Sequence, residues 1–310
     1  MNLHIFDIAN YVSAGAASQT ENIIQDSLVF KDGMFQAVEF PCGGVSFVLN
    51  TVHEFMSEDN LLIYVGDRTP IFKRAKYKKL FPSEEYKGNR PVKKSNVYEQ
   101  RLMAEDILKC IGLNVFACEG YEADDIIYSL VQQYSESFTR VFIHSRDSDM
   151  RLLVRDNVAI APVGRHGHEI NVFNFEHVPM YDYLVPHNAT MLYKLAYGDG
   201  NKDNIHAMGK AYYDLVDRFP TNIGSKFCNR EYVDFYCSYL HPDDQRLVDM
   251  IDLRWPLTVD SDFIVIDESL SIDLAKLKWF GKEVRNKYYR YEDSFQFPEC
   301  RAVIDNYLNN

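Results

Sequence analysis

The chain has 310 residues, of which 46% are hydrophobic, 25% charged and 14% aromatic. This composition is typical of an ordered globular protein and excludes disordered, collagen-like and mucin-like proteins. The length predicts two domains or one large α/β unit. The net charge of −12 argues at first against a polyanionic partner, because proteins that bind phosphates usually present a basic surface.

The charge is distributed unevenly along the chain. Residues 68–94 contain ten basic and two acidic residues, a net charge of +8 in 27 residues, so the rest of the chain carries −20. A run of charge is often only a solvated helix or loop. We interpret this basic segment instead as a surface that neutralises backbone phosphates, while the acidity of the remainder restricts where a polyanion binds.

The amino-terminal sequence contains no export signal. Its short apolar run is interrupted by Asp7 and has no basic leading region. No uncharged run in the chain approaches the ~18 residues that a membrane span requires. The six cysteines are scattered without a CxxC pair, which argues against a zinc site or a disulfide framework. We therefore expect a soluble, unexported protein with reduced thiols and no membrane partner.

Short apolar runs alternate with amphipathic stretches through the first half of the chain. This alternation predicts an α/β fold with a central, mainly parallel sheet flanked by helices. Apolar residues with helical spacing predict helices within 102–111 and 126–134. Strands are predicted over 3–6, 61–65, 114–117, 141–144 and 158–161.

The character of the sequence changes near residues 181–188, where helical, Tyr-rich and acidic segments begin. We place a domain boundary there, which gives an α/β domain over 1–185 and a mostly helical domain over 186–310. One further strand is predicted near 263–266.

Acidic residues follow the predicted strands or begin the helix after them. The carboxyl ends of parallel strands lie along one edge of a sheet, so acids that are distant in sequence converge there. Each acid alone is explained as a turn residue or a helix cap. Several like charges in one crevice, however, require a cation, and oxygen-only ligands indicate Mg²⁺ or Mn²⁺. The acids are Asp7, Asp67, Glu122, Asp124, Asp125, Asp147 and Asp149.

A later acidic loop contains Asp199 and Asp203. Its opening imitates a calcium-binding EF-hand loop, but Asn204 and Lys210 stand where that motif needs Gly and Glu. We therefore reject the calcium-loop interpretation. An ordinary loop remains the alternative for this segment taken alone.

Clustered carboxylates beside a basic segment fit phosphoryl-transfer chemistry on nucleic acid. Two metal ions ~3.5 to 4 Å apart activate water and stabilise the leaving oxygen in such enzymes. Within the basic segment, residues 86–90 would, if helical, place Lys87 and Arg90 on one face and leave Tyr86 to stack on a base.

Several motifs follow one another within residues 1–215. They are VGD at 65–67, YKGNRP at 86–91, GYEADD at 120–125, SRDSDM at 145–150, and GD and DNI within 198–205. In this order and spacing they resemble the flap endonuclease or 5′-nuclease family. That family includes the 5′-nuclease domain of bacterial DNA polymerase I and bacteriophage enzymes of the 5′-3′ exonuclease or RNase H type.

The resemblance implies a PIN/5′-nuclease-like sheet, a helical arch over the active site within residues 68–100, and a helix-turn-helix-like DNA-binding element in the second domain. It also implies two Mg²⁺ or Mn²⁺ ions. The implied ligands of the first ion are Asp7, Asp67, Glu122 and Asp124, with Asp125 close by; those of the second are Asp147, Asp149, Asp199 and Asp203.

The resemblance further implies that Lys87 and Arg90 contact the scissile phosphate, with Tyr86 beside them. The other implied nucleic-acid contacts are Arg74, Lys93, Lys94 and Lys210. Two features depart from the family pattern. Three residues rather than two separate Asp199 from Asp203, and residues 205–211 lack the usual glycines of a phosphate-binding hairpin. The grip on duplex DNA is therefore expected to be built differently.

The hypothesis that results is a divalent-metal-dependent, structure-selective 5′-nuclease of replication or repair, in the cytoplasm, or in the host cytoplasm if the chain is phage-encoded. Its substrates would be DNA with 5′ ends or flaps, with the RNA of RNA–DNA hybrids as a further candidate. A replisome or single-strand-binding partner is left open. The alternatives are a PIN-like ribonuclease, which is usually smaller and lacks the YKGNR-like arch, and a non-cleaving DNA-binding replisome protein.

Overall fold

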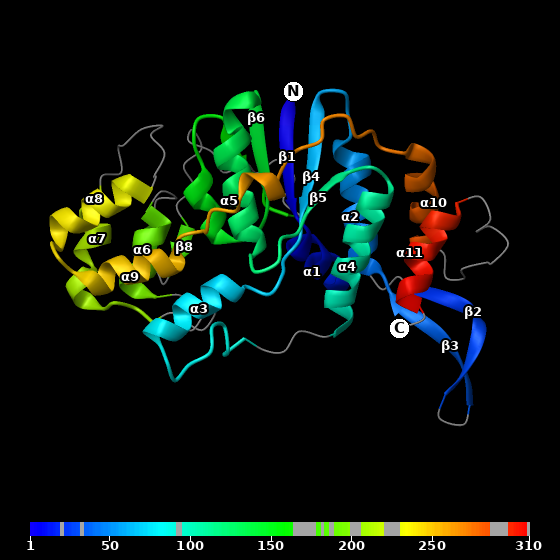
Figure 1. The fold of residues 1–310 in the computed structure, drawn as a ribbon, viewed down its shortest axis with the longest axis horizontal. Coiled ribbons are helices and arrows are strands. Elements are labelled where there is room, and N and C mark those ends of the chain that lie inside the picture. The colour runs from blue at the N-terminus through cyan, green and yellow to red at the C-terminus, as the bar shows by residue number, and fades with distance from the viewer. Residues whose placement is uncertain are drawn as a thin grey trace. The chain divides into compact units, whose positions relative to one another are not determined.

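The computed structural model describes residues 1–18, 22–31, 34–90, 95–163, 178–180, 183–185, 189–198, 206–219, 230–285 and 297–308. Figure 1 shows them as a ribbon coloured along the chain. Among these residues, no helix combines the length and the apolar character needed to cross a membrane.

The strands of the parallel sheet follow the order β5-β4-β1-β6-β7. The strands are β1 (Asn2–Asp7), β4 (Asn60–Val65), β5 (Asn114–Phe116), β6 (Arg140–His144) and β7 (Val158–Ile160). Each predicted strand in this half of the chain is found within one residue of its expected bounds. The predicted α/β class with a parallel sheet is confirmed.

The chain divides into two compact units. Unit 1 comprises residues 1–67, 93–116 and 265–310, and unit 2 comprises residues 68–92 and 117–264. Unit 1 thus takes segments from both ends of the sequence. A division into domains at residue 185 stays a prediction.

Unit 1 contains β1, β4 and β5. The register pairs Asp7 with Val65, so Asp7 stands at the carboxyl end of β1 beside the end of β4, which leads into Asp67. Ile5 and Ile63 have no exposed surface, as expected of strands that are covered on both faces.

The helices of unit 1 are α1 (Ile8–Ser18), α2 (Gly43–Phe55), α4 (Ser95–Cys110), α10 (Leu274–Arg285) and α11 (Pro298–Leu308). An antiparallel hairpin of β2 (Asn22–Lys31) and β3 (Met34–Pro41) completes the unit and was not predicted. Figure 1 shows it projecting beyond α10 and α11, which contact it at its base.

Unit 2 contains β6, β7 and most of the remaining helices. They are α3 (Ile71–Leu80), α5 (Ala123–Tyr134), α6 (Thr190–Tyr197), α7 (Asp214–Asp217), α8 (Arg230–Leu240) and α9 (Gln245–Arg254). Shorter elements are η1 (Ser135–Ser137), η2 (Ser148–Leu153), η4 (Lys210–Tyr212), η5 (Ser261–Phe263), β8 (Val178–Met180) and β9 (Tyr183–Val185). Tyr77, Leu192 and Leu215, from α3, α6 and α7, share one buried core. The predicted helical character after residue 186 is confirmed.

The strand predicted near 263–266 is wrong, and the condition that residues 86–90 are helical is not met. Residues 263–266 do not form a strand: Phe263 ends η5, and Phe263 and Val265 are 65% and 60% exposed. Of residues 263–265 only Ile264 is buried, and this short apolar run pairs with no strand among the described residues. Residues 86–90 form turns rather than a helix, and Lys87 has a φ of 58°.

Candidate active site

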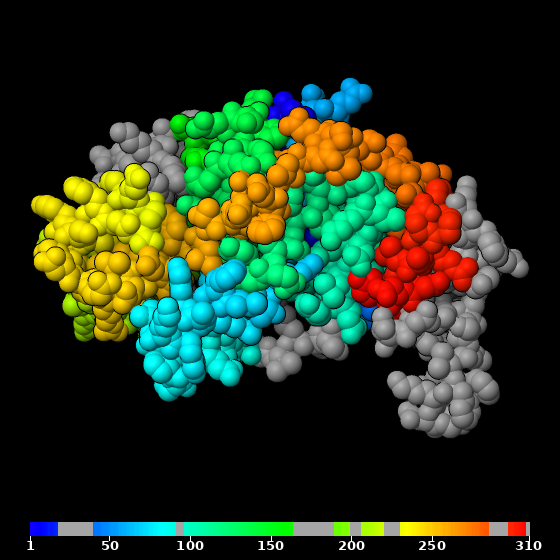
Figure 2. Space-filling view, in the orientation of Figure 1, coloured from blue at the N-terminus to red at the C-terminus, as the bar shows by residue number. Residues whose placement is uncertain are grey.

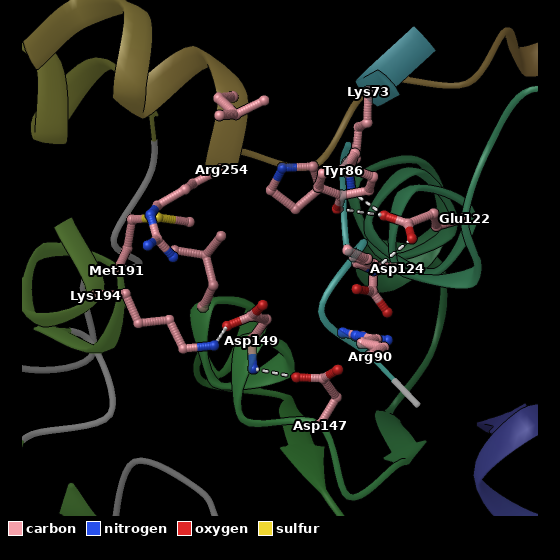
Figure 3. A pocket seen from close by; sticks show the side chains of 14 residues that line it. Lys73, Tyr86, Arg90, Glu122, Asp124, Asp147, Asp149, Met191, Lys194 and Arg254 are labelled. Atoms are coloured by element: carbon pink, nitrogen blue, oxygen red, sulfur yellow. Dashed lines mark hydrogen bonds and ion pairs between the residues drawn. The ribbon is translucent and has the colours of Figure 1, made fainter. Parts of the chain in front are cut away.

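Three carboxylates converge in unit 2. Asp124 comes from the first turn of α5, and Asp147 and Asp149 come from the start of η2. Each offers one oxygen that lies within 4.8 Å of the other two. Figure 3 shows these side chains pointing toward one another in a cleft. Such a group of hard oxygen donors fits a divalent cation such as Mg²⁺.

Local hydrogen bonds hold the η2 acids in place. The Asp147 backbone N–H donates to Ser145 Oγ at 3.1 Å, and the Asp149 N–H donates to Asp147 Oδ1 at 2.9 Å. Asp147 is therefore the N-cap of η2. The Asp147 carboxylate therefore caps η2 and also belongs to the group of three converging acids.

The three acids differ in their electrostatic surroundings. Burial, reinforced by Asp147, holds the pKa of Asp124 well above its usual range. Burial and then the charge of Asp149 raise the pKa of Asp147. For Asp149, burial acts upward, but the ion pair with the Lys194 ammonium outweighs it and lowers the pKa. A bound cation would relieve the repulsion that Asp124 and Asp147 experience.

Glu122 and Asp125 are instead occupied by basic and hydrogen-bonding partners. Lys73 Nζ lies 3.2 Å from Glu122 Oε2 and 2.9 Å from Asp125 Oδ1. Lys87 Nζ lies 2.5 Å from Glu122 Oε1, and the Tyr86 hydroxyl donates to Glu122 Oε2 at 3.1 Å. Burial opposes ionisation, yet these lysines lower the pKa of Glu122 to about 2.

Asp125 has a structural role as well. Its Oδ2 accepts the Glu122 N–H at 3.0 Å in the capping box of α5, and its Oδ1 accepts the Leu257 N–H at 2.7 Å. The side chain is fully buried. These contacts explain its position after Asp124 without a metal, and its assignment near the first ion stays a prediction.

Asp7 and Asp67 belong to unit 1. Asp7 accepts the Asn10 backbone N–H at 3.2 Å and also a bond from the Asn10 side chain. Asp67 Oδ2 lies 3.0 Å from Arg101 NH2, and the Arg101 side chain is 8% exposed. Both acids follow neighbouring strands at one sheet edge, as predicted, and their roles as metal ligands stay predictions.

The remaining predicted residues are of two kinds. Arg74, Arg90 and Lys210 are exposed. Arg90 and Lys87 both line the cleft, and Figure 3 shows the Arg90 side chain near Asp124. The others, Asp199, Asp203, Lys93 and Lys94, lie outside the described residues.

Three cationic residues that line the cleft were not predicted as part of the site: Lys73, Lys194 and Arg254. Lys194 is a single lysine in the apolar helix TMLYKLAY and is 7% exposed. A charge inside an apolar helix face is a signal for a buried ion pair. Lys73 is one of ten basic residues in its segment. The only sequence signal that it is buried is Tyr77, which is four residues later and therefore lies on the same helix face.

Comparison with known proteins identifies residues 28–179 as matching the 5′-3′ exonuclease, N-terminal resolvase-like domain. A 5′-3′ exonuclease of Buchnera aphidicola subsp. Schizaphis graminum is 28% identical over 132 residues, 41% of this chain and 44% of that protein. A 5′-3′ exonuclease of Aquifex aeolicus is 33% identical over 123 residues, 39% of this chain and 41% of that protein. The matched region thus spans less than half the length of these relatives.

Two solved structures share the fold. The bacteriophage T5 D15 protein co-crystallized with metal ions superposes with a TM-score of 0.53 at 17% identity, covering 100% of this chain and 99% of that one. The T5 5′-exonuclease with bound zinc gives a TM-score of 0.53 at 17% identity over 92% of this chain and 98% of that one. The predicted resemblance to the 5′-nuclease family is confirmed, and so is the predicted 5′-nuclease-like fold.

Proposed function

We propose that this protein is a divalent-metal-dependent 5′-nuclease that hydrolyses phosphodiester bonds in DNA carrying 5′ ends or flaps. The main observation in support is that Asp124, Asp147 and Asp149 converge in a cleft that Lys87 and Arg90 also line. All five residues fall within the segment that matches the 5′-3′ exonuclease domain.

The carboxylates would hold the cation. A divalent ion there supplies Lewis-acid stabilisation of the phosphoryl oxygens and lowers the pKa of water. We propose Mg²⁺ or Mn²⁺, since the donors are all oxygens. The T5 relatives were crystallized with metal ions, in one case zinc. A second ion is part of the proposal, and the remaining implied ligands are Asp7, Asp67 and Glu122 for the first ion and Asp199 and Asp203 for the second.

The cationic residues would hold the phosphate. Lys87 and Arg90 lie on the turn that follows α3, where they offer an ammonium and a planar guanidinium to a scissile phosphate. Lys194 neutralises Asp149 and so limits the negative charge that a phosphate meets on entering the cleft. Arg74 and Lys210, both exposed, would contact phosphates farther along the strand.

A cleavage assay tests the proposal. The full chain is incubated with 5′-labelled flap, nicked duplex, single-stranded and RNA–DNA hybrid substrates, with Mg²⁺, with Mn²⁺ or with EDTA. The proposal expects release of labelled product from a DNA flap or 5′ end in Mg²⁺ and none in EDTA. The double variant Asp147→Asn/Asp149→Asn is the control for a contaminating nuclease. Cleavage that persists in EDTA, or in this variant, would contradict the proposed site.

A further inference from the structure

Lys73 is a buried cation among the acids of unit 2. Its side chain is 6% exposed, and its Nζ contacts one oxygen each of Glu122 and Asp125, at 3.2 and 2.9 Å. Burying an ammonium costs several kcal/mol unless it is paired and hydrogen-bonded. Two carboxylates, themselves 7% and 0% exposed, offset that cost.

The backbone around Lys73 is fixed by its neighbour Phe72. The Phe72 N–H donates to Gly120 O at 3.4 Å, and its ring packs against Tyr121 with the ring centroids 4.9 Å apart. Gly120 has a φ of +88°, and a Cβ placed on it would lie 2.5 Å from the Phe72 ring. The first turn of α3 is thereby attached to the turn that precedes Glu122.

The two acids that Lys73 contacts have different partners from the other three. Asp125 accepts two backbone N–H groups in addition to the ammonium. Glu122 joins the Tyr86 hydroxyl at 3.1 Å and Lys87 Nζ at 2.5 Å. Asp124, by contrast, belongs to the group whose oxygens converge with those of Asp147 and Asp149. The five acids therefore form two sets: Lys73 contacts Glu122 and Asp125, and the other three acids converge with one another.

We propose that Lys73 is a positioning residue, a built-in cation that fixes Glu122 so that Glu122 anchors the 86–90 turn through Tyr86 and Lys87. The turn then presents Lys87 and Arg90 to the cleft in one arrangement. Without Lys73, Glu122 keeps its charge but loses its fixed position, and the turn loses its anchor. The catalytic consequence rests on the proposed nuclease function, whereas the anchoring of the turn does not.

The variants separate charge from geometry. Lys73→Met removes the charge at similar length, and Lys73→Arg retains it. Lys79→Met, on the exposed side of the same helix, is the control for loss of one positive charge from the basic segment. Glu122→Gln removes the anchor charge while leaving the Lys73–Asp125 ion pair in place.

The first readout is limited trypsin digestion of the full chain without DNA or metal. Cleavage after Lys87 is measured by mass spectrometry against cleavage after Lys210, which is exposed. Proteolysis of a held segment reports its local opening. Relative to wild type, Lys73→Met and Glu122→Gln should raise this ratio at least about three-fold, while Lys79→Met leaves it unchanged. An unchanged ratio in a folded Lys73→Met protein overturns the proposal.

The second readout is the single-turnover rate on a 5′ flap at saturating enzyme over a Mg²⁺ titration. Lys73→Met should lower the maximal rate by about ten-fold or more with little change in the half-saturating Mg²⁺, and Lys73→Arg should recover most of it. A mainly altered Mg²⁺ requirement with an unchanged maximal rate would overturn the positioning role.

If circular dichroism shows that Lys73→Met does not fold, Lys73→Gln, which still donates hydrogen bonds, takes its place in both experiments. If the wild type proves inactive, the proposed function fails while the digestion still decides the role of Lys73.

Discussion

The side chains of Asp124, Asp147 and Asp149 are held together against their mutual repulsion. Backbone caps fix Asp147 and Asp149, and the capping box of α5 fixes the turn that carries Asp124. One ammonium, that of Lys194, pairs with Asp149 among the contacts described for the group. The arrangement stores electrostatic energy that a bound cation would release.

Asp147→Asn should therefore raise the stability of the metal-free protein and lower its activity. Removing one charge relieves repulsion with Asp149 and Asp124, and a rise of roughly 2 °C in Tm corresponds to about 1 kcal/mol for a unit of this size. Loss of a ligand should lower the single-turnover rate by about 100-fold or more. Thermal melts with EDTA and with Mg²⁺ check the stability, and single-turnover kinetics check the rate. Asn keeps the Oδ1 acceptor of the cap, so a lower Tm in EDTA would show that repulsion between these carboxylates does not dominate at Asp147.

Mg²⁺ binding should release protons. The pKa values of Asp124 and Asp147 are raised, by burial first and then by neighbouring carboxylates. At a pH just above the usual aspartate pKa, these two carboxyl groups still hold protons that Mg²⁺ must displace. The affinity for Mg²⁺ should therefore increase as the pH rises from the usual aspartate pKa through their raised pKa values. Calorimetric titrations in two buffers of different ionisation enthalpy measure the release. Asp124→Asn should release fewer protons than wild type, and equal release by both would place the titrating group elsewhere.

At the scale of elements, the strands were predictable because a buried parallel strand is a short, continuous apolar run. The same rule failed at 263–266, since an apolar run carries no information on whether a partner strand is available. The β2–β3 hairpin was not predicted because an antiparallel pair between two helices is not part of the βα alternation. The turn at 86–90 could not be predicted from spacing, because neither the positive φ of Lys87 nor its ion pair with Glu122 is encoded in the spacing of residue types.

The candidate site was predicted in part for a related reason. Acids at strand ends converge whatever the details of packing, so Asp124, Asp147 and Asp149 were identified together with others. Their partition was not predictable: Asp124 groups with the two acids expected at the second ion, and Glu122 pairs with Lys73 and Lys87. Which carboxylate receives a lysine is decided by side-chain packing, which single-sequence patterns do not encode.

The junction between α3 and the Gly120 turn should be sensitive to a single methyl group. Gly120→Ala adds a Cβ 2.5 Å from the Phe72 ring at a φ of +88°, and it should cost about 2 kcal/mol or more from strain and clash together. Gly209 is a matched control, since its φ is +98° but nothing lies within 4 Å of an added Cβ. Gly209→Ala should cost only the backbone strain, about 1 kcal/mol. Urea unfolding followed by circular dichroism compares them, and equal losses would show that the Phe72 contact is unimportant.

The 86–90 turn should act on the reaction more than on binding. Lys87→Ala/Arg90→Ala removes two cations that line the cleft with the acids, and it should lower the saturated single-turnover rate by about 100-fold. Arg74→Ala, an exposed change on α3, should mainly weaken affinity. Fluorescence binding and rapid-quench kinetics separate the two. A loss of affinity alone in the double variant would reduce the turn to a solvated basic surface.

At the scale of the whole molecule, an acidic chain must confine a polyanion to a small part of its surface. The net charge is −12 while residues 68–94 carry +8, and Figure 2 shows the side chains of α3 and the following turn on the surface (light blue). Association with DNA should therefore depend on few phosphate contacts, most of them supplied by this segment. Charges elsewhere repel the backbone and favour one approach of the DNA.

Salt dependence of DNA binding tests this confinement. Lys78→Gln/Lys79→Gln removes two exposed cations of α3, and it should reduce the slope of log K against log salt by about 0.7 to 0.9 for each phosphate that these lysines neutralise in the wild type. Lys276→Gln is the control, because this lysine lies in unit 1, 3.1 Å from Glu299, outside the basic segment. Its slope should match that of the wild type, since its charge is already paired. The dissociation constant for a 5′ flap is measured over a range of salt concentrations. Ca²⁺ replaces Mg²⁺ in this measurement, so that cleavage is suppressed if the proposed function is right. Equal slopes for all three proteins would mean that DNA is held outside the basic segment, and a reduced slope for Lys276→Gln would mean that the binding surface extends into unit 1.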